Sequence, residues 1–343
     1  MENSPCPAAG SGCRTAFATP PRRAIRAVRR LGSRLALALT LAAVPVATGY
    51  AQETKAAGVV GTVVIAHGGG PEWNGGAEEV ASQVRTGGPV EVSFLMGPGA
   101  ATHRFQDAVQ RLVDAGATEI VVVPVLVSSH SGHYDQLYYL TGERDEISEV
   151  MLHHLHMSGI ERSDVEVPIR LAKAMDDSPE VARVLAERAL ALADAPEEQA
   201  LFLIGHGPNS AEDYAEWMAN LRPLADSVRA WTGFRDVRVG LVRDDAPDAV
   251  RAEAVRRVRE LITLQHEVTG RDVVVVPILV SRGSVSNEKF PRDLAGLPIV
   301  YTGDALLPHP GLARWIEARV EQMVPRVART ASGAGGMGPA HSH

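Results

Sequence analysis

Two apolar segments of the sequence are nearly identical, and they limit the folds that the chain can adopt. The segment Glu119–Ser128 reads EIVVVPVLVS, and the segment Asp272–Ser281 reads DVVVVPILVS. Such dense runs of β-branched residues are typical of strands that are buried on both faces of a sheet. A second motif also repeats, because strand-like residues precede both His67-Gly68 and His206-Gly207. The spacing predicts an internal duplication with a period of about 130–150 residues.

Strand-like and helix-like segments alternate along both copies of the repeat. The predicted strands are 59–66, 90–96, 119–127, 165–171, 200–205, 237–242 and 272–280. The predicted helices are 76–85, 102–115, 179–193, 211–231 and 248–267. This βαβα order is typical of a parallel sheet with helices on both faces. We therefore predict an α/β fold with two tandem halves, 58–195 and 196–328, each a mainly parallel four-stranded sheet flanked by helices.

One segment of the first half, at 143–164, has no counterpart in the second half. Its apolar positions recur at helical spacing and form a stripe of Ile147, Val150, Met151, His154 and Leu155. Glu149, His153 and His156 share another face of the same predicted helix. We expect an inserted, histidine-rich helix that covers the strand ends. Its histidines are either an ancillary metal-loading patch or a solvated helix face with one semi-buried histidine.

The first 51 residues differ in composition from the rest of the chain. They hold seven arginines and a single acid, Glu2, ahead of the apolar run Leu35–Val46. A basic region, a short apolar run and small residues up to Ala51 predict a signal peptide and an exported, periplasmic protein. The apolar run is short of the ~20 residues that span a bilayer, although an uncleaved N-terminal anchor is the alternative. The Gly-rich segment 329–343 is predicted to be a disordered tail.

Charge and cysteine content narrow the classes of partner and site. Removing a segment of charge +6 from a chain of charge −7 leaves a mature protein of −13, and both cysteines, Cys6 and Cys13, leave with it. Histidines and carboxylates are then the available metal ligands. The negative charge and the 5% aromatic content argue against a nucleic-acid partner, and no membrane partner is expected after cleavage. The glycines after His67 lack a P-loop lysine, so no nucleotide is expected.

Histidines follow two of the predicted strands, at the points where those strands end. His67 follows the first strand, and the segment Ser128–His133 follows the third. Ligands of open parallel sheets bind outside the carboxyl ends of the strands. Neutral imidazole is both a metal ligand and a base near pH 7. The alternative is that these histidines are hydrogen-bonded loop residues.

The same residues carry a family resemblance. Val63–Gly68 and Val123–His133 resemble the two motifs of the class II chelatases, in particular the sirohydrochlorin cobaltochelatases and ferrochelatases, over about 59–324. The resemblance implies chelatase-like halves. It also implies a divalent transition metal as substrate or bound ion (Co²⁺, Ni²⁺, Fe²⁺ or Zn²⁺) and a tetrapyrrole as the small-molecule partner.

In that family the histidine of each motif binds the incoming metal and helps to deprotonate the macrocycle. The resemblance therefore makes His67 and His133 the predicted catalytic residues. It makes His67, His130 and His133 the candidate metal ligands. The family motif usually reads Gly-x-His with an Asp shortly after it, and this sequence departs from it because Gly132 directly precedes His133. With Asp135 two residues later, His133 fits the motif better, whereas His130 lies nearer to the strand end. The neighbouring Gly68, Ser128 and Ser129 are predicted to be cofactor-binding residues.

The second half departs from this pattern. His206 matches His67, but the segment 281–286 contains no histidine. We therefore predict one active cleft, based in the first half and roofed by the second, with His206 as a structural loop residue. His309 is predicted to begin a helix.

The predicted function is the insertion of Co²⁺, Ni²⁺ or Fe²⁺ into a tetrapyrrole such as sirohydrochlorin. The alternative is an exported protein that binds metal, haem or another tetrapyrrole without catalysis on the same fold. A charge of −13 opposes a polycarboxylate substrate unless cations line the cleft. The candidates for such cations are Arg104, Arg170, Lys173 and Arg282.

Overall fold

A computed structural model describes residues 58–324 of the protein, so the predicted signal segment 1–51 and the predicted tail 329–343 lie outside the described residues. The described residues contain two four-stranded sheets in which every strand pairing is parallel. The first sheet has the order β2-β1-β3-β4, from strands β1(Val60–Ala66), β2(Val90–Phe94), β3(Glu119–Val125) and β4(Ile169–Leu171). The second sheet has the order β6-β5-β7-β8, from strands β5(Ala200–Gly205), β6(Asp236–Leu241), β7(Val273–Pro277) and β8(Ile299–Val300). The predicted fold class is therefore confirmed.

The two repeated strands occupy equivalent places in the two sheets. β3 pairs with β1 so that Pro124 lies opposite Ile65, and β7 pairs with β5 so that Pro277 lies opposite Ile204. The valines of β3 and β7 are almost inaccessible to solvent, as expected for central strands that are covered on both faces.

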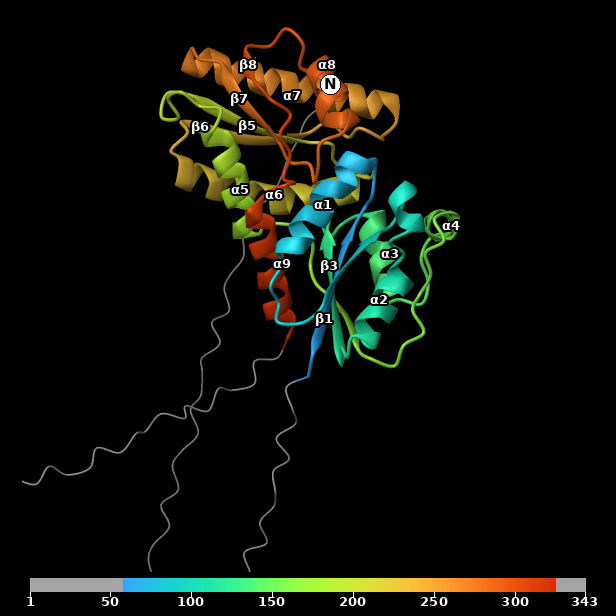
Figure 1. The fold of residues 1–343 in the computed structure, drawn as a ribbon. Helices are drawn as coiled ribbons and strands as arrows, with labels where there is room; N and C mark the ends of the chain where they lie inside the picture. Colours follow the sequence, from blue (N-terminus) through green and yellow to red (C-terminus); the bar gives the residue numbers. More distant parts are fainter. Residues whose placement is uncertain (1–57, 325–343) are drawn as a thin grey trace, which may run out of the picture. The chain divides into compact units, whose positions relative to one another are not determined.

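Helices cover both faces of each sheet. They are α1(Pro71–Gln83), α2(Phe105–Asp114), α3(Gly132–Leu140), α4(Glu149–Met157), α5(Pro179–Leu190), α6(Ala211–Thr232), α7(Asp248–Thr269), α8(Phe290–Asp293) and α9(Pro310–Met323). A 3₁₀ turn, η1(Pro98–Ala101), and a π-helical turn, η2(Val285–Lys289), complete the structure. In Figure 1 the second sheet lies between α7 on one side and α5 and α6 on the other. No helix within residues 58–324 combines the length and apolarity needed to cross a membrane.

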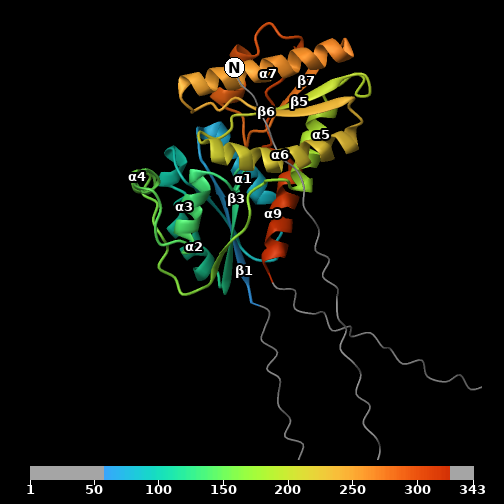
Figure 2. The same cartoon turned by 180° about the vertical axis from the view of Figure 1, so that it is seen from behind.

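The last helix of each half packs against the sheet of the other half. Helix α5, which precedes the second sheet, contacts α6, α9 and β7, whereas α9, at the end of the second half, contacts α1 and β3. Figure 2 shows the same exchange from behind, with α9 (red) beside β1 and β3. The sequence boundary near residue 195 therefore does not separate two independently packed cores.

Helices α1 and α4 differ in extent from the sequence expectation. Helix α1 begins at Pro71, because proline fits the first helical position, where its missing N–H is not needed. The insertion at 143–164 forms only α4. Leu155 of α4 is fully buried, but Val150, which was predicted to share its apolar face, is 60% exposed. The assignment of Val150 to a buried stripe was therefore wrong, because α4 buries only a narrow face against α3.

Candidate active site

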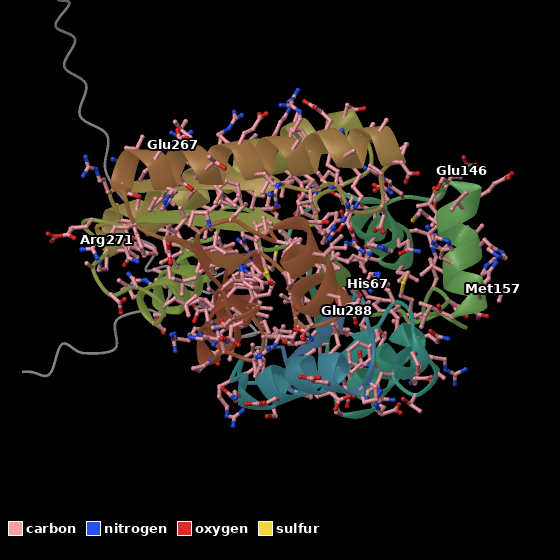
Figure 3. All side chains as sticks on the ribbon, turned by 90° about the horizontal axis from the view of Figure 1, so that it is seen from above. His67, Glu146, Met157, Glu267, Arg271 and Glu288 are labelled. Atoms are coloured by element: carbon pink, nitrogen blue, oxygen red, sulfur yellow. The ribbon has the colours of Figure 1, made fainter. Side chains whose placement is uncertain are left out.

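A cavity of about 690 Å³ lies at the carboxyl ends of the central strands, with walls from both halves. The first half contributes residues that include His67, Gly68, Trp73, Ser128, Ser131 and His133. The second half contributes residues that include His206, Trp217, Asp244, Asp245, Ser281 and Arg282. The expected cleft, based in the first half and roofed by the second, is therefore present. In Figure 3 His67 lies toward the inside of the molecule, whereas Met157 of α4 lies at its outer edge.

The turn after β1 fixes the orientation of the His67 ring. Gly68 has φ +91°, and a Cβ at this position would collide with the carbonyl oxygen of Met96, so only glycine fits. The Nδ1 atom of His67 lies 2.7 Å from the carbonyl oxygen of Gly68. Because a carbonyl oxygen can only accept, Nδ1 carries the proton and Nε2 keeps its lone pair. In the neutral form of the ring, Nε2 is therefore free to bind a ligand.

His133 is held in the same tautomer by a different partner. It lies in the first turn of α3, and its Nδ1 atom is 3.0 Å from Oε1 of Gln136. The Nε2 atom of Gln136 donates to the carbonyl oxygen of Met151 in α4, at 2.9 Å. Oε1 of Gln136 is consequently the acceptor, so Nδ1 of His133 donates and its Nε2 is free. Helix α4 thereby fixes the ring of His133 through Gln136.

The two imidazoles of the first half lie against each other. The ring centroids of His67 and His133 are 4.6 Å apart, with an interplanar angle of 86°. Burial, followed by repulsion from His67, lowers the pKa of His133 from 6.5 to about 4. His133 is therefore neutral at physiological pH and can act as a ligand or accept a proton.

An aspartate in a strained backbone conformation holds the loop between β3 and α3. Asp176 is buried and has φ 45°, which is rare for a residue other than glycine. Its carboxylate accepts hydrogen bonds from the N–H and the hydroxyl of Ser129, at 2.8 and 2.7 Å. Asn220 of α6 donates to the same carboxylate at 3.3 Å. Ser129 does not line the cavity, so the structure places it in the support of the loop, whereas Ser128 and Gly68 do line it.

His130 lies apart from the histidine pair and does not line the cavity. Its side chain is 41% exposed, and its Nε2 atom is 4.0 Å from a carboxylate oxygen of Glu216. Its carbonyl oxygen accepts a hydrogen bond from Nε1 of Trp217, at 2.6 Å. Of the two alternatives in the second motif, the structure brings His133, and not His130, to His67.

His206 is a cavity residue that the sequence analysis assigned to a structural role. Its turn repeats that of His67, since Nδ1 lies 2.8 Å from the carbonyl oxygen of Gly207 and Nε2 is left free. Its ring lies 5.5 Å from that of Trp217, and burial lowers its pKa. The repeated His-Gly motif is the sequence signal for this placement, although the second half lacks the histidine of the second motif.

The remaining histidines have other surroundings. His309 caps α9, with Nδ1 accepting from the N–H of Gly311 at 3.0 Å, in agreement with its predicted place at a helix start. His153 and His156 are exposed on α4, and His154 is partly buried. Within residues 58–324 no three His, Cys, Asp or Glu side chains converge as a metal-binding group. The His67–His133 pair therefore offers at most two protein nitrogens to one ion and leaves coordination positions open.

Carboxylates predominate among the charged residues that line the cavity. Glu72, Asp244 and Asp245 are acidic, and Arg282 is basic. Although burial opposes ionisation, Lys289 at 2.5 Å and Arg251 at 3.3 Å hold the pKa of Asp244 below its usual value. Two indole side chains, Trp73 and Trp217, add aromatic surface to the walls.

Part of the sequence matches a known protein family. The CbiX family model matches residues 61–192, so the resemblance of the first half to the chelatases is confirmed. SirB from Bacillus subtilis with Fe³⁺ superposes with a TM-score of 0.52 at 18% identity, over 77% of this chain and 95% of that one. This likeness shows the fold.

Two other solved structures are similar at lower scores. DR2241 from Deinococcus radiodurans, a multi-domain protein with structural similarity to chelatases, gives a TM-score of 0.49 at 19% identity, over 77% of this chain and 54% of that one. CbiX, the terminal enzyme for biosynthesis of siroheme in denitrifying bacteria, gives 0.46 at 15% identity, over 78% of this chain and 100% of that one. No curated protein matches the sequence.

Proposed function

Because residues 61–192 match the CbiX family model, we propose that this protein inserts a divalent transition metal into a tetrapyrrole. The observation that carries the proposal is the His67–His133 pair. Its rings are 4.6 Å apart on the wall of a cavity, and hydrogen bonds at Nδ1 leave both Nε2 atoms free.

The chemistry of insertion matches what such a pair can do. A tetrapyrrole must lose its two pyrrole N–H protons while the metal ion exchanges its own ligands for the pyrrole nitrogens. Neutral imidazole accepts protons, and two protein ligands leave the ion open to the incoming macrocycle. Both cysteines lie at positions 6 and 13, so no thiolate of residues 58–324 can retain the ion. The metal is thus held weakly enough to be transferred.

The proposal extends to the class of metal. Imidazole nitrogen suits Fe²⁺, Co²⁺, Ni²⁺ and Zn²⁺, whereas Mg²⁺ and Ca²⁺ prefer oxygen ligands. We expect activity with ions of the first group, of which Co²⁺, Ni²⁺ and Fe²⁺ are the candidate substrates.

The cavity also suits a flat organic substrate. Its volume of about 690 Å³ falls within the range of roughly 300–1,000 Å³ that is typical of small-molecule sites. Trp73 lies on the same wall as the histidine pair, with its ring 6.4 Å from that of His67. We propose that the macrocycle enters with one face toward His67 and His133.

The decisive experiment follows metal insertion directly. Purified protein is mixed with sirohydrochlorin or a porphyrin and with Co²⁺, Ni²⁺ or Fe²⁺, and the absorption bands of the macrocycle are recorded over time. We expect a rate above that of the metal and macrocycle alone, and loss of this acceleration in His67→Ala. His309→Ala, which changes a histidine outside the cavity, is the matched control. Stoichiometric binding without acceleration would contradict the enzyme and support the alternative, a protein that binds metal or a tetrapyrrole without catalysis.

We further propose, from the basic and apolar segment before Ala51, that the mature protein is exported. N-terminal sequencing of the protein recovered from a fractionated expression host tests this. A mature terminus at residue 52 in the periplasmic fraction is expected, and an intact first residue in the cytoplasmic fraction would contradict it.

A further inference from the structure

We infer that His206 of the second half is the base that takes the first pyrrole proton from the macrocycle, while His67 and His133 hold the metal ion. The inference rests on the proposed function and adds a catalytic residue to it. It follows from the number of free nitrogen lone pairs in the cavity and from the walls on which they lie.

The histidine pair cannot hold the metal ion and accept a proton at the same time. Each ring carries its own proton on Nδ1, which is hydrogen-bonded to Gly68 in His67 and to Gln136 in His133, so only Nε2 has a free lone pair. When both Nε2 atoms bind the ion, neither ring has a lone pair left for a pyrrole proton. The first deprotonation then requires a base outside the pair.

His206 brings a third imidazole to the same cavity. Its Nδ1 atom lies 2.8 Å from the carbonyl oxygen of Gly207, so this nitrogen carries the proton and Nε2 keeps its lone pair. The ring of Trp217 packs against it at a centroid distance of 5.5 Å, and Nε1 of Trp217 is itself bonded to the carbonyl oxygen of His130. The ring of His206 is thus held in position before any substrate binds.

The place of His206 in the fold keeps it apart from the metal ligands. It follows β5 of the second sheet, whereas His67 follows β1 of the first sheet and His133 lies in α3. Within the described part of the chain, 58–324, no three His, Cys, Asp or Glu side chains converge as a metal-binding group. The lone pair of His206 therefore stays available when the pair is loaded with metal.

A macrocycle between the two walls would meet the metal ion on one face and His206 on the other. As an ion approaches one face of a pyrrole, the nitrogen lone pair turns toward the ion and the N–H bond turns toward the opposite face. The proton is thereby directed to the wall of the second half. A base must lie within reach of the proton that it accepts, and His206 meets this requirement from that wall.

The first transfer breaks one pyrrole N–H bond and forms an N–H bond at Nε2 of His206. The electron pair of the broken bond stays on the pyrrole nitrogen, which uses it to bind the ion, and His206 becomes an imidazolium. As the ion moves into the macrocycle, Nε2 of His67 or His133 is released and accepts the second proton. Both protons then pass to water, so the products are the metallated macrocycle and two protons.

The groups around His206 suit a base that is neutral before the reaction. Burial lowers the pKa of His206, and the nearby His67 lowers it further, whereas the carboxylates of Asp245 and Asp244 oppose the change. The ring is therefore neutral at pH 7 and can accept a proton. The two carboxylates then stabilise the imidazolium that forms.

The cations on this wall are bound to other groups. Lys289 of η2 and Arg251 of α7 both pair with Asp244, at 2.5 and 3.3 Å. Arg243 donates to two backbone carbonyl oxygens of the loop after β5, and Arg282 pairs with another aspartate at 3.1 Å. These contacts keep Asp244 ionised and leave Nε2 of the histidine free to accept.

The test separates proton transfer from metal binding, with Co²⁺ and sirohydrochlorin as the substrates. In His206→Ala the affinities for Co²⁺ and for sirohydrochlorin, each measured by titration, should stay within about tenfold of the wild type. The kcat of insertion should fall about a hundredfold or more, because general bases contribute roughly 10²–10⁴-fold. His67→Ala, by contrast, should lose both metal affinity and kcat. His266→Ala, which removes an imidazole outside the cavity, is the matched control and should change neither.

Chemical rescue provides a readout that a purely structural role would not change. His206→Gly leaves a space for the lost ring, into which added imidazole can diffuse. Imidazole should raise the insertion rate of this variant on the order of tenfold, because it restores a base at the same place. Thiazole, a ring of similar shape that is a much weaker base, should not. Each rate is compared with that of the wild type at the same concentration of added ring, since imidazole also binds metal in solution.

The outcomes distinguish this inference from the function on which it rests. An unchanged kcat in His206→Ala would overturn the inference and leave the chelatase function standing. An equal fall in kcat and in metal affinity would also overturn it, because His206 would then be a ligand. A response to imidazole no larger than the response to thiazole would assign the residue to packing and overturn it too. If the wild type itself does not accelerate insertion, both the proposed function and the inference fail.

Discussion

The two halves of the protein share a scaffold and differ in the loop that follows the central strand. After β3, the segment 128–133 leads into α3 and presents His133 to the cavity. After β7, the equivalent segment 281–286 turns back on itself, with the hydroxyl of Ser286 bonded to the N–H of Gly283 at 3.0 Å. The strands that precede the two loops are nearly identical in sequence. The strands therefore determine where a side chain can face the cavity. The loop after the strand determines which side chain lies there.

Because the loops differ, the His-Gly turn that both halves share has different neighbours in each half. His67 lies next to a second imidazole, with ring centroids 4.6 Å apart, whereas His206 lies next to Trp217, at 5.5 Å. The second half supports the first across the cavity, because Trp217 and Asn220 of α6 donate hydrogen bonds to His130 and Asp176. The first half thus holds the histidine pair, and the second half supplies a cavity wall and hydrogen bonds that support the first.

Among the variants, removal of the histidine pair should cause the largest loss of metal affinity. In His67→Ala/His133→Ala the affinity for Co²⁺ or Zn²⁺ should fall on the order of a thousandfold, because both free nitrogens are lost and even outer-shell partners of metal ligands are worth 10–100-fold. In His206→Ala, at the equivalent turn of the second half, the loss should be about tenfold or less. Isothermal titration of the metal-free proteins measures both.

Equal losses of metal affinity in the two variants would contradict the proposed difference between the halves. Equal losses would mean that both halves contribute ligands to one site, against the geometry of residues 58–324. Unchanged affinity in the double variant would place the metal elsewhere, with His153 and His156 of α4 as the next candidates.

The pH dependence of stability should also reveal the buried histidine of the first half, His133. The pKa of His133 is lowered from 6.5 to about 4. Between these values the unfolded chain binds a proton that the folded chain does not, so the free energy of unfolding rises with pH. Metal-free protein should lose about 3 kcal/mol through this residue as the pH falls from 6.5 to 4.

Urea unfolding of the wild type and of His133→Asn across this window checks the expectation. Asparagine removes the titration, so the variant should show a shallower slope, while the carboxylates and His206 contribute equally to both proteins. Parallel slopes would show that His133 titrates normally in the folded state.

Much of this architecture was predictable from short-range patterns. Runs such as Glu119–Val127 are too rich in β-branched residues to be surface elements, and the alternation of strands and helices predicts parallel sheets. The placement of His67 and His133 at the carboxyl edge of the sheet followed from the same reasoning, because the carboxyl ends of neighbouring strands meet at one edge. Local sequence could therefore identify the edge of the sheet at which the site lies.

Features that depend on contacts between distant segments were not predictable in this way. The exchange of α5 and α9 between the two sheets leaves no local signal, because the apolar face of a helix does not say which sheet it covers. The choice between His130 and His133 likewise depends on how α3 begins. The role of Gln136 depends on its hydrogen bond to the carbonyl oxygen of Met151 in α4, which no local sequence pattern predicts.

Gln136 offers a way to sharpen the comparison, since it is the first half's means of orienting a histidine. In Gln136→Leu the ring of His133 loses its acceptor at Nδ1, so the affinity for Co²⁺ should fall about tenfold. Gln136→Glu keeps an acceptor for Nδ1 but loses the donor to the carbonyl oxygen of Met151, so it should retain only part of the affinity. The visible absorption spectrum of bound Co²⁺ provides a second readout that reports ligand geometry. Equal behaviour of the two variants would mean that Gln136 acts through packing alone.

The smallest effect is expected at His130, the alternative ligand of the second motif. Its side chain is 41% exposed and does not line the cavity, and its nearest charged partner, Glu216, is 4.0 Å away. Exposed pairs of this kind contribute roughly 0–1 kcal/mol to stability. The hydrogen bond from Trp217 uses the backbone carbonyl of His130, which a substitution retains. His130→Ala should therefore change metal affinity by less than about twofold and leave the melting temperature within a few degrees of the wild type. A loss comparable to that of His133→Ala would show that the loop rearranges when metal binds and that both histidines of the motif reach the ion.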